Sequence, residues 1–236
     1  MTALTLDMGF ETWASGPAVI PTDPASFAAE SFAQLLGSAG VKAPDNPPGT
    51  DAVPPAGSVV IATIHSPPLR QIIGAMLRPS DNQIAELMVK ELGYHATGLG
   101  TTPAGLRVVR SVDTRLGIPW KGTVMVDGSG LSHDDRTACQ TLLAVLYLGD
   151  KQRFSAIPQG LSVAGVNGTL AERFLTPPLR GHVLAKTGSI NGAAGMVGEV
   201  DVAKPVRFAM VFNQPQPDWV LLGDENNAIN AIAPYP

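Results

Sequence analysis

Three apolar segments joined by short connections fill the last third of the chain, and this pattern constrains the fold more than any other feature. They are Val183–Thr187, Gly195–Val200 and Val206–Phe212. Each has the length and residue types of a β-strand. Strands joined by so few residues pair antiparallel, because a parallel pair needs a long crossover. A helical pattern from Trp219 to Ile232 follows, so the sequence predicts an antiparallel meander with a helix packed on it.

Helical patterns dominate the residues before these strands, and most have a start or stop signal. Pro79 disfavours helix at the residue before it, so it separates two of them. The predicted helices run from Asp23-Pro24 to Gly37, through the apolar stripes Ile72–Leu77 and Ile84–Leu92, from Thr102-Pro103 to Gly117, and from a capping box of Thr137 and Gln140 to about Gly149. Helices on either side of an antiparallel sheet make the fold class α+β.

Shorter elements complete the expected organisation. Ser58–His65 has the pattern of a buried strand, Val124–Val126 that of a short strand, and Leu4–Met8 alternates like a strand. The proline-rich stretch Ala43–Gly57 predicts a loop. We expect two parts: residues 1–22 as the end of an inserted subdomain or linker, and residues 23–236 as the main domain.

The composition excludes several function classes. Hydrophobic residues make up 44% and charged residues 15%, so a buried core is feasible. The net charge is −4 without a Lys/Arg cluster, so no nucleic-acid partner is expected. No run approaches the roughly 18 apolar residues of a membrane span. The histidines lack metal-ligand spacing, and we expect no metal or cofactor: they are His65, His95, His133 and His182.

Ser80-Asp81-Asn82 lies at the break between two predicted helices and allows two interpretations. Ser80 with Gln83 fits a capping box for the second helix, which is a purely structural role. The alternative is a functional role, which the local sequence does not specify. The local sequence leaves both interpretations open.

Two further motifs have the same ambiguity. Lys186-Thr187-Gly188-Ser189 could be an ordinary strand end, yet a lysine in an apolar strand is costly without partners, which favours a functional role. Asp127-Gly128-Ser129-Gly130-Leu131-Ser132 follows a strand and could be a glycine-rich turn in which Asp and Ser bond the local backbone.

Together and in this order, the motifs resemble the serine-type D-Ala-D-Ala carboxypeptidase/endopeptidase family, the low-molecular-mass class C penicillin-binding proteins. The similar sequence segments also include Ser66-Pro67-Pro68-Leu69, Met76-Leu77 and Ile84-Ala85. The resemblance extends from about residue 20 to the end. It implies part of a penicillin-binding-protein/β-lactamase-like transpeptidase fold and an acyl-serine mechanism acting on peptidoglycan of the cell wall.

The resemblance also implies roles for individual residues. Ser80 would relay a proton to the leaving D-Ala amine, and Asn82 would bond the substrate amide and steady Lys186, which would place positive charge near the substrate carboxylate. Thr187 and Ser189 would bind that carboxylate. The backbone N–H of Ser189 would form half of the oxyanion hole.

The remaining motif residues are also expected to contribute to binding. Gly188 belongs to the segment that would pair with the extended substrate peptide. Asp127 and Ser129 are expected near the substrate, without an assigned mechanistic step. The implied ligands are a stem peptide ending in D-Ala-D-Ala and β-lactams.

The sequence departs from the family at the nucleophile. No serine has a lysine three residues on, and no Gly-x-Ser-x-Gly elbow occurs. We expect the Ser-x-x-Lys motif in a missing N-terminal half and this chain alone to be inactive. A non-catalytic module that binds D-Ala-D-Ala or a partner, and a truncated relic, are the alternatives.

The family works outside the cytoplasmic membrane, which implies an extracytoplasmic location in the cell envelope or secreted. The first residues of this sequence have neither the basic nor the apolar region of a signal peptide.

Overall fold

The computed structural model describes residues 19–41, 55–214 and 218–234, which fall into two compact units divided between His65 and Ser66. In the first unit, α1 (Pro24–Ser38) begins where the sequence predicts, because the side chain of Asp23 accepts hydrogen bonds from the N–H groups of Ala25 and Ser26. The predicted strand Leu4–Met8 and most of the predicted loop 43–57 lie outside the described residues. The domain boundary predicted after residue 22 stays a prediction.

The strand predicted at Ser58–His65 is wrong. Its residues have no regular structure, and Val59 and Ile64 are 80% and 97% exposed. A strand exists only where a neighbouring strand satisfies its backbone N–H and C=O groups. Among the described residues no strand pairs with this segment. Its apolar composition therefore does not create a strand.

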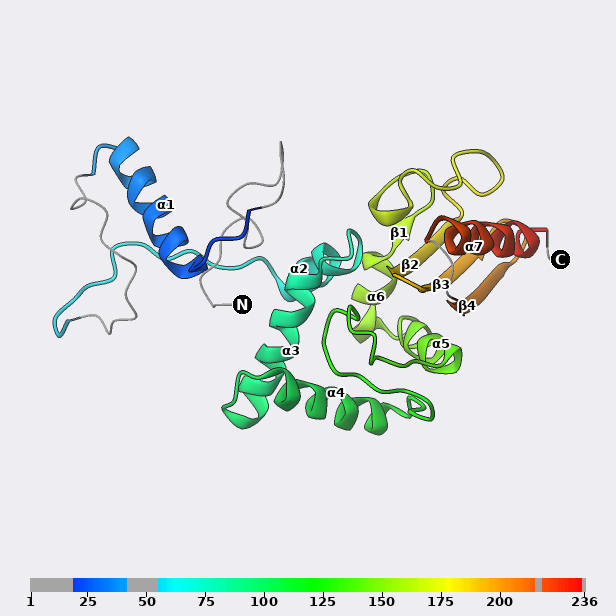
Figure 1. Ribbon diagram of the computed structural model, residues 1–236, viewed down its shortest axis with the longest axis horizontal. Helices are drawn as coiled ribbons and strands as arrows, with labels where there is room; N and C mark the ends of the chain where they lie inside the picture. Colours follow the sequence, from blue (N-terminus) through cyan, green and yellow to red (C-terminus); the bar gives the residue numbers. More distant parts are fainter. Residues whose placement is uncertain (1–18, 42–54, 215–217, 235–236) are drawn as a thin grey trace. The chain divides into compact units, whose positions relative to one another are not determined.

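Three helices open the second unit (Figure 1): α2 (Leu69–Leu77), α3 (Asn82–Thr97) and α4 (Thr102–Leu116). The predicted break at Pro79 is confirmed. Gly98 and Gly117 end α3 and α4 in the left-handed conformation, which glycine adopts without a Cβ clash.

Small residues let α3 and α4 approach closely. A Cβ on Gly105 would lie 1.8 Å from the carbonyl oxygen of Val89, and one on Gly93 would lie 2.8 Å from the nitrogen of Gly105. Ala104 is fully buried beside them. The two backbones therefore touch, and α4 is held against the helix that follows the Ser80 turn.

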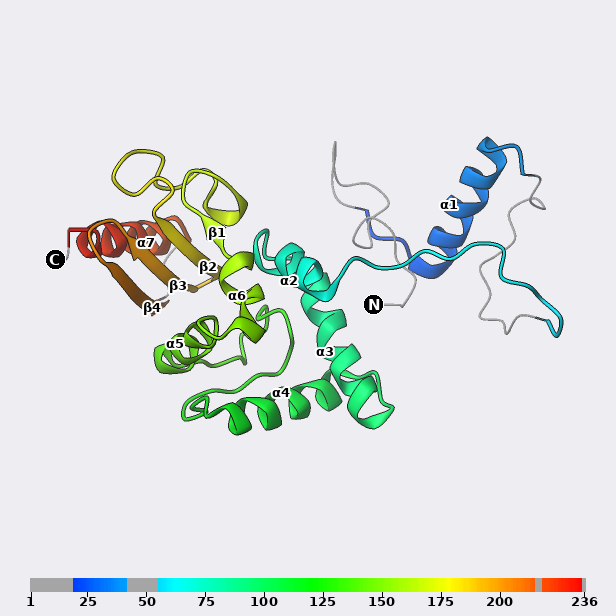
Figure 2. The ribbon, with the colours of Figure 1, turned by 180° about the vertical axis from the view of Figure 1, so that it is seen from behind.

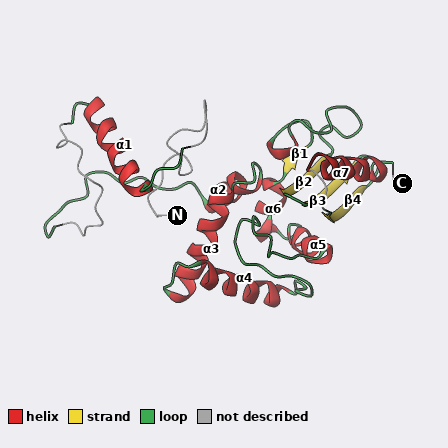
Figure 3. Cartoon of the chain, viewed as in Figure 1, coloured by secondary structure: helices red, strands yellow, loops and turns green. Residues whose placement is uncertain are grey.

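The predicted meander is confirmed as a four-stranded antiparallel sheet in the order β1-β2-β3-β4. The strands are β1 (Ser162–Val163), β2 (Val183–Ile190), β3 (Ala193–Asp201) and β4 (Pro205–Asn213), seen together at the C-terminal end of the unit in Figure 3. A two-residue turn at Asn191 and Gly192 joins β2 to β3, which sets Lys186 opposite Val197.

The main core lies between the sheet and α7 (Asp218–Ile232), the helix predicted at the C-terminus. Figures 1 and 2 show α7 lying along the strands. Alternate strand residues point to one face of a sheet, so the buried side chains recur with period two. Those in the core include Val183, Ala185, Met196, Val200, Phe208 and Ile229.

A second helix, α5 (Cys139–Leu148), packs on β3 and β4. Arg207 precedes the core residue Phe208 in β4, so its side chain points to the opposite face of the sheet. Its guanidinium binds Asp150, just after α5, and Glu199 on β3. The predicted capping box at Thr137 is wrong, because α5 starts later and Ala138 is its N-cap residue without a side-chain cap. The predicted strand at Val124–Val126 is reduced to one bridge between Val124 and Arg136.

Short elements that the sequence did not predict connect α5 to β2. They are a 3₁₀-helix (Gln152–Phe154), α6 (Ala156–Gly160), β1 and the 3₁₀-helix η3 (Gly168–Leu170). None of the helices within the described ranges is both long enough and apolar enough to cross a membrane.

Candidate active site

Ser80 occupies the turn between α2 and α3 in a strained conformation. Its φ is +61°, a left-handed value that is unfavourable for a residue with a Cβ. The capping-box interpretation of Ser80 is wrong, because Asp81 is the N-cap residue and its carboxylate accepts from the N–H of Ile84 at 2.8 Å. The hydroxyl of Ser80 is thus left for another partner.

That partner is Lys186 on β2. Its Nζ lies 2.6 Å from Ser80 Oγ, and it also donates to the carbonyl oxygen of Thr187. Burial lowers the pKa of Lys186 to about 8. The ammonium is therefore still mainly protonated at neutral pH, close enough to deprotonation to exchange a proton with a neighbouring group.

The residues around this pair leave room for a ligand. Asn82 is exposed at the first position of α3, and Gly188 and Ser189 are exposed on β2. A Cβ on Gly188 would meet no atom within 4 Å. The structure thus places Ser80, Lys186 and this exposed strand end beside one another.

At this point no described strand covers the outer edge of β2. Among the described residues, β1 pairs with β2 only at Leu184 and Ala185, whereas β3 pairs with β2 along its whole length. From Lys186 onward, the outer backbone groups of β2 are unpaired by any described strand. Such an edge can accept an extended peptide as an additional strand.

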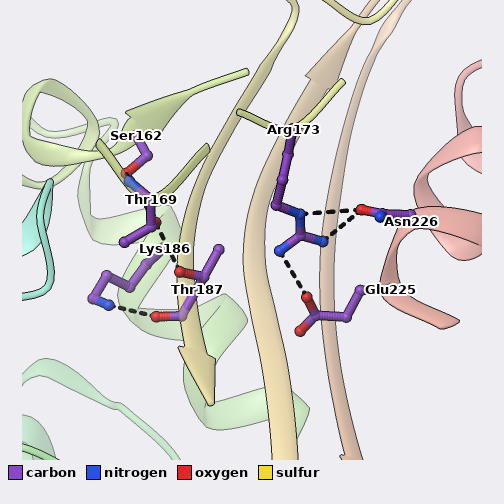
Figure 4. A network of polar contacts seen from close by, with 7 residues as sticks. All are labelled: Ser162, Thr169, Arg173, Lys186, Thr187, Glu225 and Asn226. Atoms are coloured by element: carbon purple, nitrogen blue, oxygen red, sulfur yellow. Dashed lines mark hydrogen bonds and ion pairs between the residues drawn. The ribbon is translucent and has the colours of Figure 1, made fainter. Parts of the chain in front are cut away.

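A chain of hydroxyl groups extends from Thr187 (Figure 4), and the sequence gave no reason to select its other two members, Thr169 and Ser162. Thr187 Oγ1 donates to Thr169 Oγ1 at 2.8 Å, and Thr169 Oγ1 lies 3.2 Å from Ser162 Oγ. Ser162 is fully buried and donates to the carbonyl oxygen of Arg78 at 2.8 Å. This chain connects β2 to the turn that carries Ser80.

Gly168 brings η3 against the same turn. A Cβ there would lie 2.3 Å from Ser162 Oγ and 2.6 Å from the carbonyl oxygen of Arg78, and its φ of +62° also suits glycine. The N–H of Thr169 donates to Ser162 Oγ at 3.0 Å and to the Arg78 carbonyl at 3.2 Å.

Arg173 ties the segment after η3 to α7 (Figure 4). Its guanidinium donates to Glu225 at 3.0 Å and to Asn226 Oδ1 at 2.7 and 3.1 Å. Glu225 is fully buried. Burial raises the pKa of Glu225, and the charge of Arg173 opposes that rise. This ion pair fixes the loop that carries Thr169 to the core helix.

Asp127 shapes its own loop. Its two carboxylate oxygens accept from the N–H groups of Gly130 at 2.5 Å and Ser132 at 2.8 Å. These contacts are the ones expected if the motif is a glycine-rich turn in which Asp127 bonds the local backbone. Its expected place beside a substrate stays a prediction.

The Asp127 loop is attached to α3 through Glu86. Glu86 Oε1 accepts from the N–H groups of Gly128 at 2.8 Å and Ser129 at 2.9 Å. A Cβ on Gly128 would lie 2.8 Å from Val89 Cγ2, so only glycine fits. The substrate-binding role expected for Ser129 also stays a prediction.

Metal chemistry has no evident site in the described part of the chain, where no group of three or more His, Cys, Asp or Glu side chains is placed to hold an ion. Ser80, Lys186, Thr187 and the exposed end of β2 offer hydroxyl groups, an ammonium and backbone donors. This set suits proton transfer and the binding of a carboxylate.

Comparison with known proteins points the same way. The profile of the D-Ala-D-Ala carboxypeptidase 3 (S13) family matches residues 14–231. The D-alanyl-D-alanine carboxypeptidase DacB of Haemophilus influenzae is 30% identical over 161 residues, covering 66% of this chain and 34% of that protein. A D-alanyl-D-alanine carboxypeptidase of an Actinomadura strain is 33% identical over 186 residues, covering 75% of this chain and 34% of that protein.

The fold is also shared with a solved structure. Penicillin binding protein 4 of Haemophilus influenzae, in complex with a β-lactam, superposes with a TM-score of 0.73 at 24% identity, covering 92% of this chain and 53% of that one. The predicted fold class is confirmed. The chain spans about a third of the length of the two curated relatives.

Proposed function

Because the chain belongs to the D-Ala-D-Ala carboxypeptidase 3 (S13) family, we propose that it supplies the substrate-binding and proton-transfer part of a D-alanyl-D-alanine carboxypeptidase. The substrate is a peptidoglycan stem peptide ending in D-Ala-D-Ala, and β-lactams bind in its place. The observation that carries this proposal is the contact between Ser80 Oγ and Lys186 Nζ at 2.6 Å beside the free edge of β2.

The pair can transfer a proton in the acylation step. When a nucleophilic serine attacks the terminal amide, the leaving D-Ala amine must gain a proton. Ser80 donates it and is recharged from the ammonium of Lys186, whose pKa of about 8 permits the exchange. The lysine of the Ser-x-x-Lys segment takes the proton that the nucleophile loses and returns it to this pair. Hydrolysis of the acyl-serine then completes the reaction.

The exposed end of β2 holds the substrate. The stem peptide adds as a strand along Lys186–Ser189, which orients its scissile amide. The positive charge of Lys186 and the hydroxyls of Thr187 and Ser189 bind the terminal carboxylate, which selects a free D-Ala end. The Ser189 N–H contributes one oxyanion donor, and Asn82, exposed at the start of α3, bonds the substrate amide.

The nucleophile belongs to a Ser-x-x-Lys segment that is not in this sequence. We propose that the N-terminal half of the same fold supplies it, from a longer protein or a second polypeptide. The outer edge of β4 is where such a half can join, because among the described strands β4 pairs only with β3. The assembled enzyme acts outside the cytoplasmic membrane, where peptidoglycan lies.

The alternative, a binding module without turnover, is favoured by one observation: no serine of this sequence has a lysine three residues on. A chain with the binding edge but no nucleophile holds D-Ala-D-Ala ends without cleaving them. The two proposals share the substrate and differ only in whether a Ser-x-x-Lys half joins.

Binding is tested by titrating the isotope-labelled chain with diacetyl-L-Lys-D-Ala-D-Ala and recording amide shifts by NMR. We expect changes at Lys186–Ser189 and at the Ser80 turn, smaller changes with a peptide ending in D-Ala-L-Ala, and none in a Lys186→Met variant that keeps its fold. A wild-type chain without any change at β2 contradicts the proposed substrate.

Turnover is tested separately with a fluorescent penicillin, using circular dichroism to confirm folding. A folded chain without covalent label supports a half-site that needs its nucleophile from elsewhere. Covalent label on this chain contradicts that part of the proposal, because it means that a serine here is activated without a Ser-x-x-Lys lysine.

A further inference from the structure

The hydroxyl chain behind Thr187 has a fixed direction, because each hydroxyl group has only one proton to donate. Ser162 uses its proton on the carbonyl oxygen of Arg78. Thr169 Oγ1, 3.2 Å from Ser162 Oγ, must therefore be the donor of that contact. With the proton of Thr169 committed, Thr187 must donate its own to Thr169, as its 2.8 Å contact allows.

The surroundings of Ser162, at the buried end of the hydroxyl chain, prevent the opposite direction of hydrogen-bond donation. Ser162 is fully buried, and its oxygen also accepts from the N–H of Thr169, so both its lone pairs are used. The place beside it is filled, since even a Cβ on Gly168 would lie 2.3 Å from Ser162 Oγ. The Arg78 carbonyl can only accept. The direction is therefore set from the core outward to Thr187.

We infer that Thr169 is a specificity-determining positioning residue for the carboxylate-binding end of β2, an inference that rests on the proposed function. While the cleft is empty, Thr187 donates its hydroxyl hydrogen bond to Thr169, so Thr187 presents only lone pairs to a ligand. A terminal carboxylate needs a donor, and Thr187 supplies one only by turning its proton away from Thr169. A terminal amide NH₂ can donate to Thr187 at once.

The hydrogen bond from Thr187 to Thr169 must be broken before Thr187 can bind a carboxylate, whereas an amide NH₂ binds without breaking it. Carboxylate binding therefore has a free-energy cost that amide binding does not have. When the carboxylate arrives, one hydroxyl–hydroxyl bond is exchanged for a stronger bond to an anion. When free D-Ala leaves, Thr187 donates its hydrogen bond to Thr169 again and the cleft returns to its resting state. Thr169 thus weakens the hold on the product as well as on the substrate.

The affinities of N-acetyl-D-Ala-D-Ala and of its C-terminal amide for the chain test this inference by NMR titration. Removing the acceptor in Thr169→Val is expected to raise the preference for the acid over the amide about three- to tenfold, the value of one hydrogen bond. Thr169→Ser, which keeps the hydroxyl, is expected to stay within about twofold of wild type. Equal weakening of both ligands by Thr169→Val would show a merely structural role and overturn the inference.

A second measurement does not depend on binding or on the fold of a variant. Neutron diffraction from deuterated crystals of the wild-type chain locates the deuteron on Thr187 Oγ1. A deuteron directed at Thr169 supports the inferred direction of the hydroxyl chain, and one directed elsewhere overturns it. If neither ligand binds the wild type but the deuteron is directed at Thr169, the proposed substrate fails while the inferred hydrogen-bond direction stands.

Discussion

Ser80 Oγ and Lys186 Nζ lie 2.6 Å apart although 106 positions separate the two residues in the chain. Ser80 makes this contact from a left-handed backbone, and Lys186 makes it with a largely buried ammonium on β2. Each of these features is unfavourable on its own. Both therefore make measurable contributions to stability, and these can be tested without an activity assay.

Burial of Lys186 predicts that wild type gains stability over Lys186→Met as the pH rises. Its pKa is lowered from 10.5 to about 8, so between these values the unfolded chain holds a proton that the folded chain has lost. The free energy of unfolding therefore rises with pH across this window. Below the window Lys186 is charged in both states, and the full cost of burying its ammonium destabilises the folded chain. The gain is on the order of 3 kcal/mol, at about 1.4 kcal/mol per pKa unit. Urea denaturation of both proteins at several pH values measures it, and a difference that stays flat refutes it.

The φ of +61° at Ser80 predicts that Ser80→Gly is more stable than Ser80→Ala. Both variants lose the hydroxyl, so the contact to Lys186 cancels in the comparison. Only alanine retains the Cβ that disfavours this conformation, and the difference is expected to be about 1 kcal/mol. Thermal and urea denaturation measure it; an alanine variant that equals the glycine variant would mean that the turn relaxes to a negative φ.

Arg173 is predicted to stabilise the fold because it compensates the buried carboxylate of Glu225. Arg173→Met leaves a fully buried carboxylate without its cation and is expected to cost about 3–5 kcal/mol of the free energy of unfolding. The loss should be smaller at acidic pH, because the raised pKa of Glu225 lets it become neutral there. The matched control is Arg173→Met with Glu225→Met, which should recover most of the stability. A single variant as stable as the double variant contradicts the prediction.

The contact of α3 with α4 predicts opposite effects of alanine at two helical glycines. Gly105→Ala places a Cβ 1.8 Å from the carbonyl oxygen of Val89, so the helices must separate, and we expect a loss of about 2 kcal/mol or more. Gly223→Ala, within α7, meets no atom within 4 Å and should gain about 0.5–1 kcal/mol from helix propensity. Chemical denaturation compares the two; equal effects would disprove close packing as the cause.

Much of the fold could be predicted because its signals are local. Apolar segments of strand length and short links are enough to define β2, β3 and β4 as a meander, and Asp23-Pro24 marks the start of α1. The Asn191-Gly192 pair is a readable turn signal that also fixes the register of the hairpin. The strand predicted at Ser58–His65 failed because pairing depends on a partner, and composition does not reveal one.

The site could be predicted only in part, for a related reason. The motifs select Ser80 and Lys186, but the turn sequence alone fits a helix cap equally well. Only the fold shows that Asp81 caps α3 and that the Ser80 hydroxyl reaches Lys186. Ser162 and Thr169 were missed because single hydroxyl residues have no periodic pattern, and their meaning comes from contacts far along the chain.

The sheet edge at β4 has a practical consequence for handling this chain. An unpaired strand edge can recruit the same edge of another molecule. No described strand covers the outer edge of β4, so at high concentration we expect self-association through Pro205–Asn213. Dilution, or a lysine placed on this strand, keeps the chain monomeric for the titrations above.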